Sequence, residues 1–212
     1  TPEIMVIFIV MGALGTFGYN FQTILPLVTK YLLASGASTL ALLTTVMGAG
    51  SVLAGLIAAY RGKPGQRLLI GAGACFAVLF LAMGLSSIAA LTAVLMFLVG
   101  LCGVLFMTAA NTRVQLLVPQ HLRGKVMGIY FMLFVGTTPI GSFVTGQLAE
   151  SIGVRSTVLV LGTLCAGGVV SGLTYGLRTR SRGAGGARPM SMPALGAEAR
   201  LRMPPRERGE EA

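Results

Sequence analysis

NTRVQLLVPQHLRGKVMGIY, residues 111–130, is a short basic stretch between two long apolar runs that carry no charge. Residues 90–112 and 126–148 are each long enough to cross the roughly 30 Å hydrocarbon core of a bilayer as a helix. Backbone groups in lipid must be hydrogen-bonded internally, which favours helices for both runs. The stretch therefore predicts a loop on one face of a membrane, from which the other spans can be counted.

The composition agrees with a protein that crosses a membrane several times. The chain has 212 residues, of which 54% are hydrophobic and only 10% are charged, and its mean hydropathy is +0.83. A soluble domain is excluded by these values. The net charge of +10 comes from residues in short loops and a tail, so it is not evidence for a nucleic-acid partner.

Six apolar runs without Asp, Glu, Lys or Arg predict an all-α polytopic membrane protein with six transmembrane helices. The predicted spans lie near residues 4–29, 39–60, 68–86, 90–112, 126–148 and 156–177. From residue 178 onward the composition changes to Arg, Gly, Pro, Ser and Glu with few large apolar residues. We therefore expect a six-helix bundle in residues 1–177 and a disordered basic tail in residues 178–212.

The loops set the expected orientation, because short loops rich in Lys and Arg stay in the cytoplasm. The second-to-third and fourth-to-fifth loops contain six basic residues: Arg61, Lys63, Arg67, Arg113, Arg123 and Lys125. The loops on the other side contain only Lys30 and Arg155. The pattern predicts a multi-pass protein of the cell (inner) membrane with both termini cytoplasmic.

An internal repeat relates the second and fifth spans. Residues 50–58, GSVLAGLIA, match residues 141–149, GSFVTGQLA, at an offset of 91 residues (141 minus 50), which is three helices. Three is odd, so the two copies cross the membrane in opposite directions. This predicts two inverted three-helix repeats, the arrangement of many secondary transporters.

Catalytic and metal-binding patterns are missing. The chain has no Asp, a single His at position 121, no phosphate-cradling motif, and three cysteines without metal-ligand spacing. We expect neither an enzyme nor a site for a metal or cofactor.

Polar residues inside spans are the better indication of function, because in lipid they face a cavity or another helix. The first span carries Tyr19, Asn20 and Gln22, and the fourth carries Thr108, Asn111 and Gln115. These six residues are predicted to bind a substrate, although hydrogen bonds between helices would explain them equally well. Pro26 and the segment from Pro139 to Gly141 predict kinks that help a helix bend between two states.

The segments of residues 118–128, VPQHLRGKVMG, and 21–27, 111–115 and 139–142, with Gly146, carry a family resemblance. The first resembles the loop between the tenth and eleventh helices of major facilitator superfamily transporters. The others resemble the drug and siderophore exporters of the enterobactin exporter type. The resemblance covers residues 2–177 and makes the six spans helices seven to twelve of a twelve-helix carrier.

What the resemblance implies is alternating access, with the first and fourth helices of each half lining the cavity. Arg123 and Gly124 match the family's cytoplasmic gate loop, in which Pro119 also lies. Residues 60–67 lack the acid of the usual pattern, so an Asp–Arg gate is not expected there. Proton antiport would need a titratable group in an N-terminal six-helix half that this chain does not include.

The sequence therefore predicts a half-exporter of an apolar or amphipathic small molecule, such as a drug or siderophore, surrounded by membrane lipid. The alternatives are a six-helix membrane assembly partner and a half-carrier that dimerises.

Overall fold

The structure is a computed structural model that describes residues 2–62 and 64–186, and its regular elements there are helices. In chain order they are α1 (Pro2–Ala13), η1 (Leu14–Gly18), α2 (Phe21–Leu27), η2 (Val28–Leu32), α3 (Ala37–Arg61), α4 (Gln66–Leu85), α5 (Ala89–Leu117), η3 (Gln120–Leu122), α6 (Arg123–Val135), α7 (Thr138–Ile152) and α8 (Val154–Gly186). η1 and η2 are π-helical, and η3 is a 3-10 helix.

These elements make six helices that are long and apolar enough to cross a membrane, which confirms the predicted fold class. The spans run over Glu3–Leu32, Ala37–Arg61, Gln66–Leu85, Ala89–Leu117, Gln120–Ile152 and Val154–Thr179. The fifth extends further than predicted on both sides: it begins earlier because η3 continues almost directly into α6, and it ends later because α7 runs to Ile152.

The chain divides after Leu177 into two units, and each is described by itself. In the second unit the structure describes residues 178–186, which continue the helix α8 into the segment for which the sequence predicts disorder. The rest of that prediction, for residues 187–212, lies outside the described residues.

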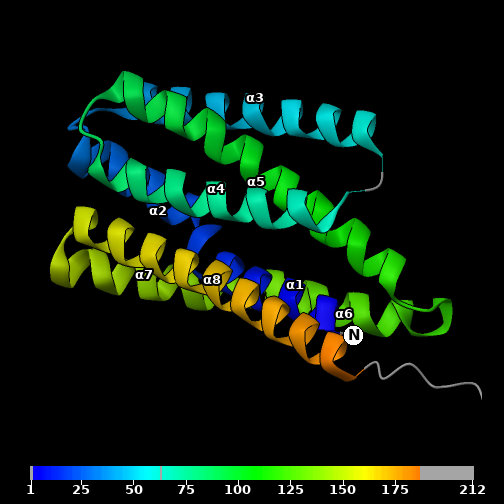
Figure 1. Cartoon of the computed structure of the whole chain (residues 1–212). Helices are drawn as coiled ribbons and strands as arrows, with labels where there is room; N and C mark the ends of the chain where they lie inside the picture. Colours follow the sequence, from blue (N-terminus) through cyan, green and yellow to red (C-terminus); the bar gives the residue numbers. More distant parts are fainter. Residues whose placement is uncertain (1, 63, 187–212) are drawn as a thin grey trace, which may run out of the picture. The chain divides into compact units, whose positions relative to one another are not determined.

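The loops gather basic residues at one end of the first unit, here called the basic end. This end carries Arg61, Arg67, Arg113, Arg123 and Lys125. The turns at residues 33–36, at residues 86–88 and at Gly153 lie at the opposite end (Figure 1).

The first span is interrupted at Asn20. The π-turn η1 ends with the Tyr19 amide donating to the Leu14 carbonyl at 3.0 Å, and Asn20 leaves helical geometry at φ −87°, ψ 41°. The Asn20 side chain donates to the Thr16 carbonyl at 2.6 Å, so it replaces a backbone partner that the break removes. Pro26, where the sequence predicts a kink, lies inside α2 beyond this break.

The fifth span is interrupted just before Pro139. Helix α6 ends at Val135, Gly136 and Thr137 form a turn, and α7 begins with Pro139 in its first turn. Proline is tolerated in a first turn because the missing N–H would have no partner inside the helix. The interruption thus falls directly before the segment from Pro139 to Gly141, for which the sequence predicts a kink.

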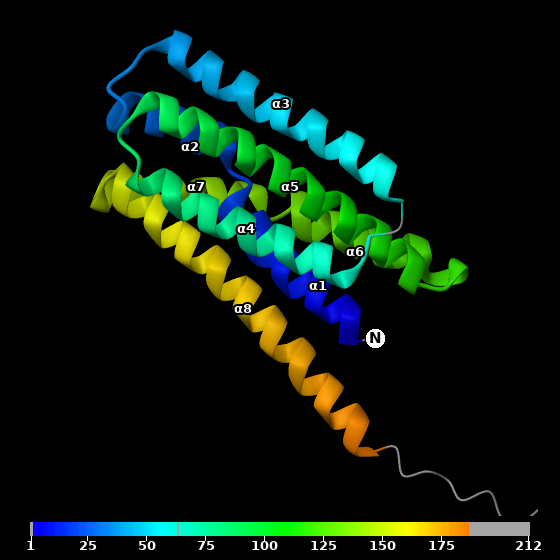
Figure 2. The same cartoon turned by 45° about the horizontal axis from the view of Figure 1, so that its top comes forward.

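The repeat-matched glycines make equivalent close contacts. A Cβ on Gly50 of α3 would overlap the Phe97 carbonyl of α5, and one on Gly141 of α7 would overlap the Thr16 carbonyl of η1. The second span therefore packs on the fourth as the fifth packs on the first. Figures 1 and 2 both show α3 lying beside α5.

The turns that follow α3 and α7 are also related by the repeat. Gly62 ends α3 at φ 65°, and Gly153 ends α7 at φ 84°. Both lie in the left-handed region, which glycine adopts without steric cost, and they differ by the same 91 residues as Gly50 and Gly141. The repeat therefore extends from helix packing into backbone conformation.

Small residues also bring α8 against the start of the first span. A Cβ on Gly168 would overlap Ala13, and one on Gly172 would lie within contact distance of Val10 and Val6. Lipid provides no hydrophobic drive between helices, so such close approach is what holds them together.

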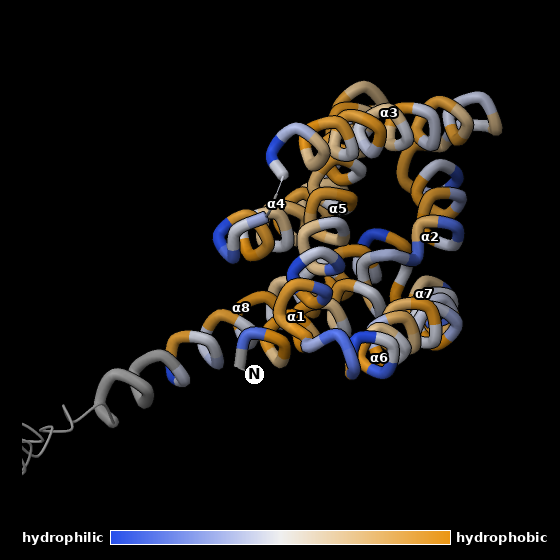
Figure 3. Tube along the Cα trace, turned by 90° about the vertical axis from the view of Figure 1, so that its right-hand side faces the viewer, coloured by the Kyte–Doolittle hydropathy of each residue, from blue (hydrophilic) through white to orange (hydrophobic). Residues whose placement is uncertain are grey.

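The second and fifth spans are the least covered by the rest of the chain. Only 17% and 11% of their most apolar windows are buried, whereas the other four spans reach 39–50%. Figure 3 shows hydrophobic residues along α3, whose one covered face lies on α5.

Candidate functional site

The interruptions of the first and fifth spans meet at Asn20. Its side chain is 2% exposed, and its Oδ1 accepts a 3.2 Å hydrogen bond from the hydroxyl of Ser142 in α7. Gly141, next to Ser142, brings the α7 backbone against Thr16 and Asn20. Ser51, the repeat partner of Ser142, instead bonds to the Met47 carbonyl of its own helix. The Asn20–Ser142 bond is thus a feature of the broken pair of spans.

Tyr19 joins four spans beside this contact. Its hydroxyl donates to the Gly103 carbonyl of α5 at 2.6 Å, and its ring stacks on Phe76 of α4 at 5.2 Å between centroids. The Phe134 ring of α6 meets it edge-on at 5.1 Å. Aromatic pairs of this geometry contribute beyond their buried area. The structure therefore places Tyr19 inside the aromatic packing of the bundle.

Gln22 and Pro26 lie on another face of α2, where both are exposed. They line a cavity of about 270 Å³ whose other wall is α3. Its lining residues are Phe21, Gln22, Leu25, Pro26, Leu40, Thr44 and Met47. The cavity is apolar apart from one amide and one hydroxyl.

The polar residues predicted to bind a substrate in the fourth span lie in two places. Thr108 lines a cavity of about 50 Å³ at the basic end, together with Gly62 and Pro64. Asn111 and Gln115 bond to each other, with the Gln115 amide donating to the Asn111 Oδ1 at 2.7 Å. The cavities described above do not bring Asn111 or Gln115 together with Gln22.

The gate-loop residues lie on the surface of the basic end. Pro119 caps η3, where its carbonyl accepts from the Leu122 amide at 3.0 Å, and Arg123 begins α6. Pro119, Arg123 and Gly124 are all exposed, and nothing lies within 4 Å of a Cβ built on Gly124.

An ion pair closes the basic end near the loop that lacks an acid. The Arg113 guanidinium lies 2.7 Å from the Glu3 carboxylate and also donates to the Pro64 carbonyl at 3.2 Å. Arg113 is 17% exposed and Glu3 39% exposed. The start of the first span thus supplies the acid that residues 60–67 do not. We call these three residues the clasp.

The site offers hydrogen bonds and apolar contact rather than acid–base or metal chemistry. Within the part of the chain that the structure describes, no group of three His, Cys, Asp or Glu side chains could hold a metal ion. The carboxylates in residues 3–179 are those of Glu3 and Glu150, which stand at the two ends of the spans.

Sequence reasoning missed Ser142, Gly103, Phe76 and Glu3. Ser142 could have been found from the sequence, since it follows Gly141 inside the repeated Gly-Ser pair. Gly103 takes part through a carbonyl, which every residue has, and Glu3 lies 110 residues from its partner Arg113. No spacing rule connects such distant positions.

Comparison with known proteins gives a matching family and a relative that is similar over a short stretch. Residues 1–200 match the family model of major facilitator proteins described as transmembrane secretion effectors. The chain is also 39% identical over 51 residues to the multidrug efflux pump Tap of Mycolicibacterium fortuitum. That match covers 24% of this chain and 12% of the pump's length. No solved structure matches the chain significantly.

Proposed function

The chain belongs to the transmembrane secretion effector family of the major facilitator superfamily, and we propose that it forms one six-helix half of an exporter. The exported molecule is apolar or amphipathic, and a second six-helix half completes the carrier. Export proceeds by alternating access. The membrane is the cell (inner) membrane, and the basic end faces the cytoplasm, since its loops hold the excess of Lys and Arg.

The observation that carries the proposal is the exposure of the two repeat-related spans. Apolar side chains cover the outer surface of both: Val52 and Leu56 on α3 are 67% and 64% exposed, and Ile140 and Phe143 on α7 are 60% and 69% exposed. Two surfaces related by the repeat, and both left uncovered, suit contact with one partner that has the same internal symmetry. A second six-helix half is such a partner.

The polar residues of the first span support the substrate class. Gln22, Pro26 and Thr44 line an apolar cavity between α2 and α3, on the side of the uncovered second span. One amide and one hydroxyl among hydrocarbon side chains suit a molecule with few polar groups and no charge. A sugar phosphate or a small ion would need charged ligands that these spans do not supply.

Proton antiport needs a group that titrates within the membrane. The predicted spans contain no Asp, Glu, Lys or Arg, so the proposal assigns the proton-binding carboxylate to the other half.

Gln22→Ala and Asn111→Ala are expected to change the ratio of efflux rates among a dye, a macrolide and a siderophore by about tenfold. Each removes an amide that would orient a bound molecule, and neither side chain is packed in the core. The measurement is resistance and efflux in an efflux-deficient host, with the amount of inserted protein determined by immunoblot.

Tyr60→Ala is the matched control, because this polar-tipped side chain is 94% exposed at the end of α3. Unchanged ratios in both amide variants, at normal protein levels, would remove Gln22 and Asn111 from the substrate site.

A further inference from the structure

Two cavities of the bundle are lined by repeat-matched residues. The first cavity lies at the basic end, between the α3–α4 turn and α5, and is called the basic-end cleft. The second lies between the α7–α8 turn and the end of the first span, and is called the opposite-end cleft. The basic-end cleft includes Ala58, Arg61, Gly62, Pro64, Thr108 and Thr112. The opposite-end cleft includes Ala149, Ile152, Gly153, Arg155, Leu27 and Tyr31.

These two lists correspond position by position. The turn residues of the first list precede those of the second by the 91 residues that separate Gly50 from Gly141. The correspondence of the first and fourth spans follows from the close contacts, in which Thr16 stands against Gly141 as Phe97 stands against Gly50. The end of the first span, at Leu27 and Tyr31, lines the cleft beside the α7–α8 turn, as Thr108 and Thr112 of α5 line the cleft beside the α3–α4 turn. The two clefts are thus the same place in the two inverted repeats.

The matched clefts differ in volume. The opposite-end cleft measures about 760 Å³ and the basic-end cleft about 50 Å³. The clasp accounts for the small one, because Arg113 holds both the Pro64 carbonyl of the turn and the Glu3 carboxylate.

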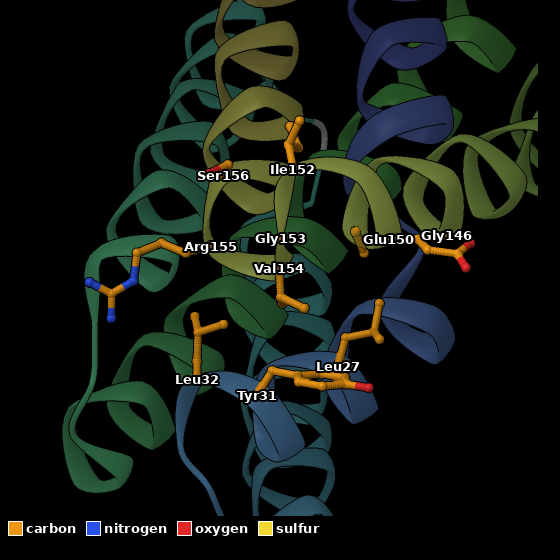
Figure 4. A pocket seen from close by; sticks show the side chains of 11 residues that line it. Leu27, Tyr31, Leu32, Gly146, Glu150, Ile152, Gly153, Val154, Arg155 and Ser156 are labelled. Carbon is orange, nitrogen blue, oxygen red and sulfur yellow. The ribbon is translucent and has the colours of Figure 1, made fainter.

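The charged residues around the open cleft do not point into it. The Arg155 guanidinium donates to the Ser87 hydroxyl at 2.6 Å, away from the cleft. Figure 4 shows this guanidinium and the Glu150 carboxylate directed outward at opposite edges, while the Tyr31 ring and Leu27 face Val154. The exposed wall of the cleft is polar and apolar in nearly equal parts, which suits a molecule that has both kinds of surface.

We propose that the opposite-end cleft binds an uncharged amphipathic small molecule and serves as the last binding place of an exported compound before release. Its volume lies within the range of roughly 300–1,000 Å³ that is usual for small-molecule sites. The Tyr31 ring offers a flat apolar face with a hydroxyl at its edge. The two clefts are equivalent places in the two inverted repeats, one closed and one open. The clasp holds the basic-end cleft shut. This inference rests on the proposed function.

Tyr31→Trp places a single fluorescent tryptophan in the cleft, because the chain contains no tryptophan of its own. The protein is purified in nanodiscs and titrated with Nile red, an uncharged amphipathic dye, and the signal is the fluorescence change relative to the unsubstituted protein. Tyr60→Trp, at the exposed end of α3, is the matched control. We expect saturable energy transfer to the dye at position 31, and only a linear, partition-type response at position 60.

A lipid chain in the cleft is distinguished by nanodiscs made with lipid brominated on the acyl chains, which quenches a tryptophan that touches it. Quenching at position 31 that exceeds that at position 60 and is not relieved by Nile red would overturn the proposal in favour of lipid. An identical dye response at both positions would overturn it as well. Export of Nile red by the Tyr31→Trp variant, measured in vesicles, shows whether the proposed function stands when the cleft assignment fails.

Glu3→Gln in the Tyr31→Trp background tests the link between the clefts. Release of Arg113 is expected to weaken the apparent affinity at position 31 by about two- to fivefold, as for the loss of one partly exposed ion pair. Arg67→Gln removes an exposed charge at the basic end outside the clasp and both clefts, and it is expected to leave the affinity unchanged. An unaltered affinity in Glu3→Gln would break the link between the clasp and the open cleft.

Discussion

Gly141→Ala is expected to destabilise the six-helix unit by about 3 kcal/mol, the upper range for overpacking a close contact. The added Cβ would overlap the Thr16 carbonyl and the Asn20 side chain. Backbone cannot give way as the end of a flexible side chain can, so the two interrupted spans must move apart. The measurement is thermal unfolding in detergent together with export of a dye, and both should fall sharply.

Gly146→Ala is the matched control on the same helix, because nothing lies within 4 Å of the Cβ it adds. The repeat supplies a second pair. Gly50→Ala should behave like Gly141→Ala, since its Cβ would overlap the Phe97 carbonyl, and Gly55→Ala should behave like Gly146→Ala. Equal stability of the close-packed and open members in either pair would contradict the helix contacts described here.

Tyr19→Ala is expected to cost about 3–5 kcal/mol, as large aromatic truncations in packed interiors do. The substitution removes the stack on Phe76, the edge contact with Phe134 and the bond to the Gly103 carbonyl. Detergent unfolding of the purified variant measures the loss, with Tyr60→Ala as the control for removing an exposed tyrosine ring.

Tyr19→Phe separates packing from hydrogen bonding. It keeps the ring contacts and loses only the bond to Gly103, which is worth about 1 kcal/mol. If Tyr19 also binds substrate, the phenylalanine variant should change selectivity while remaining nearly as stable as the parent. A small effect of Tyr19→Ala on unfolding would contradict the role of this ring as the centre of the bundle.

The spans could be predicted because each depends on composition within one short run. Apolar runs of membrane-crossing length become helices whatever their neighbours are. The repeat was also visible, since residues 50–58 match residues 141–149 at a constant offset. Both are local signals that require no knowledge of which spans touch.

The contacts of the candidate site could not be predicted in the same way. The first span is interrupted at Asn20, where the Asn20 side chain bonds to Thr16 and to Ser142 of another helix. The clasp joins Glu3 to Arg113 across most of the bundle's sequence. A polar side chain within an apolar span marks Asn20 as a candidate site residue. Only the packing of the spans shows which residues it contacts.

Proton-driven uptake of Nile red into inside-out membrane vesicles is the most direct test of the account. The vesicles come from an efflux-deficient host that carries the natural gene, and respiration makes their interior acidic. Dye uptake is expected to exceed that of host vesicles without the gene and to collapse when nigericin dissipates the pH gradient. Uptake no greater than in vesicles without the gene, with the protein present in the membrane, would contradict it.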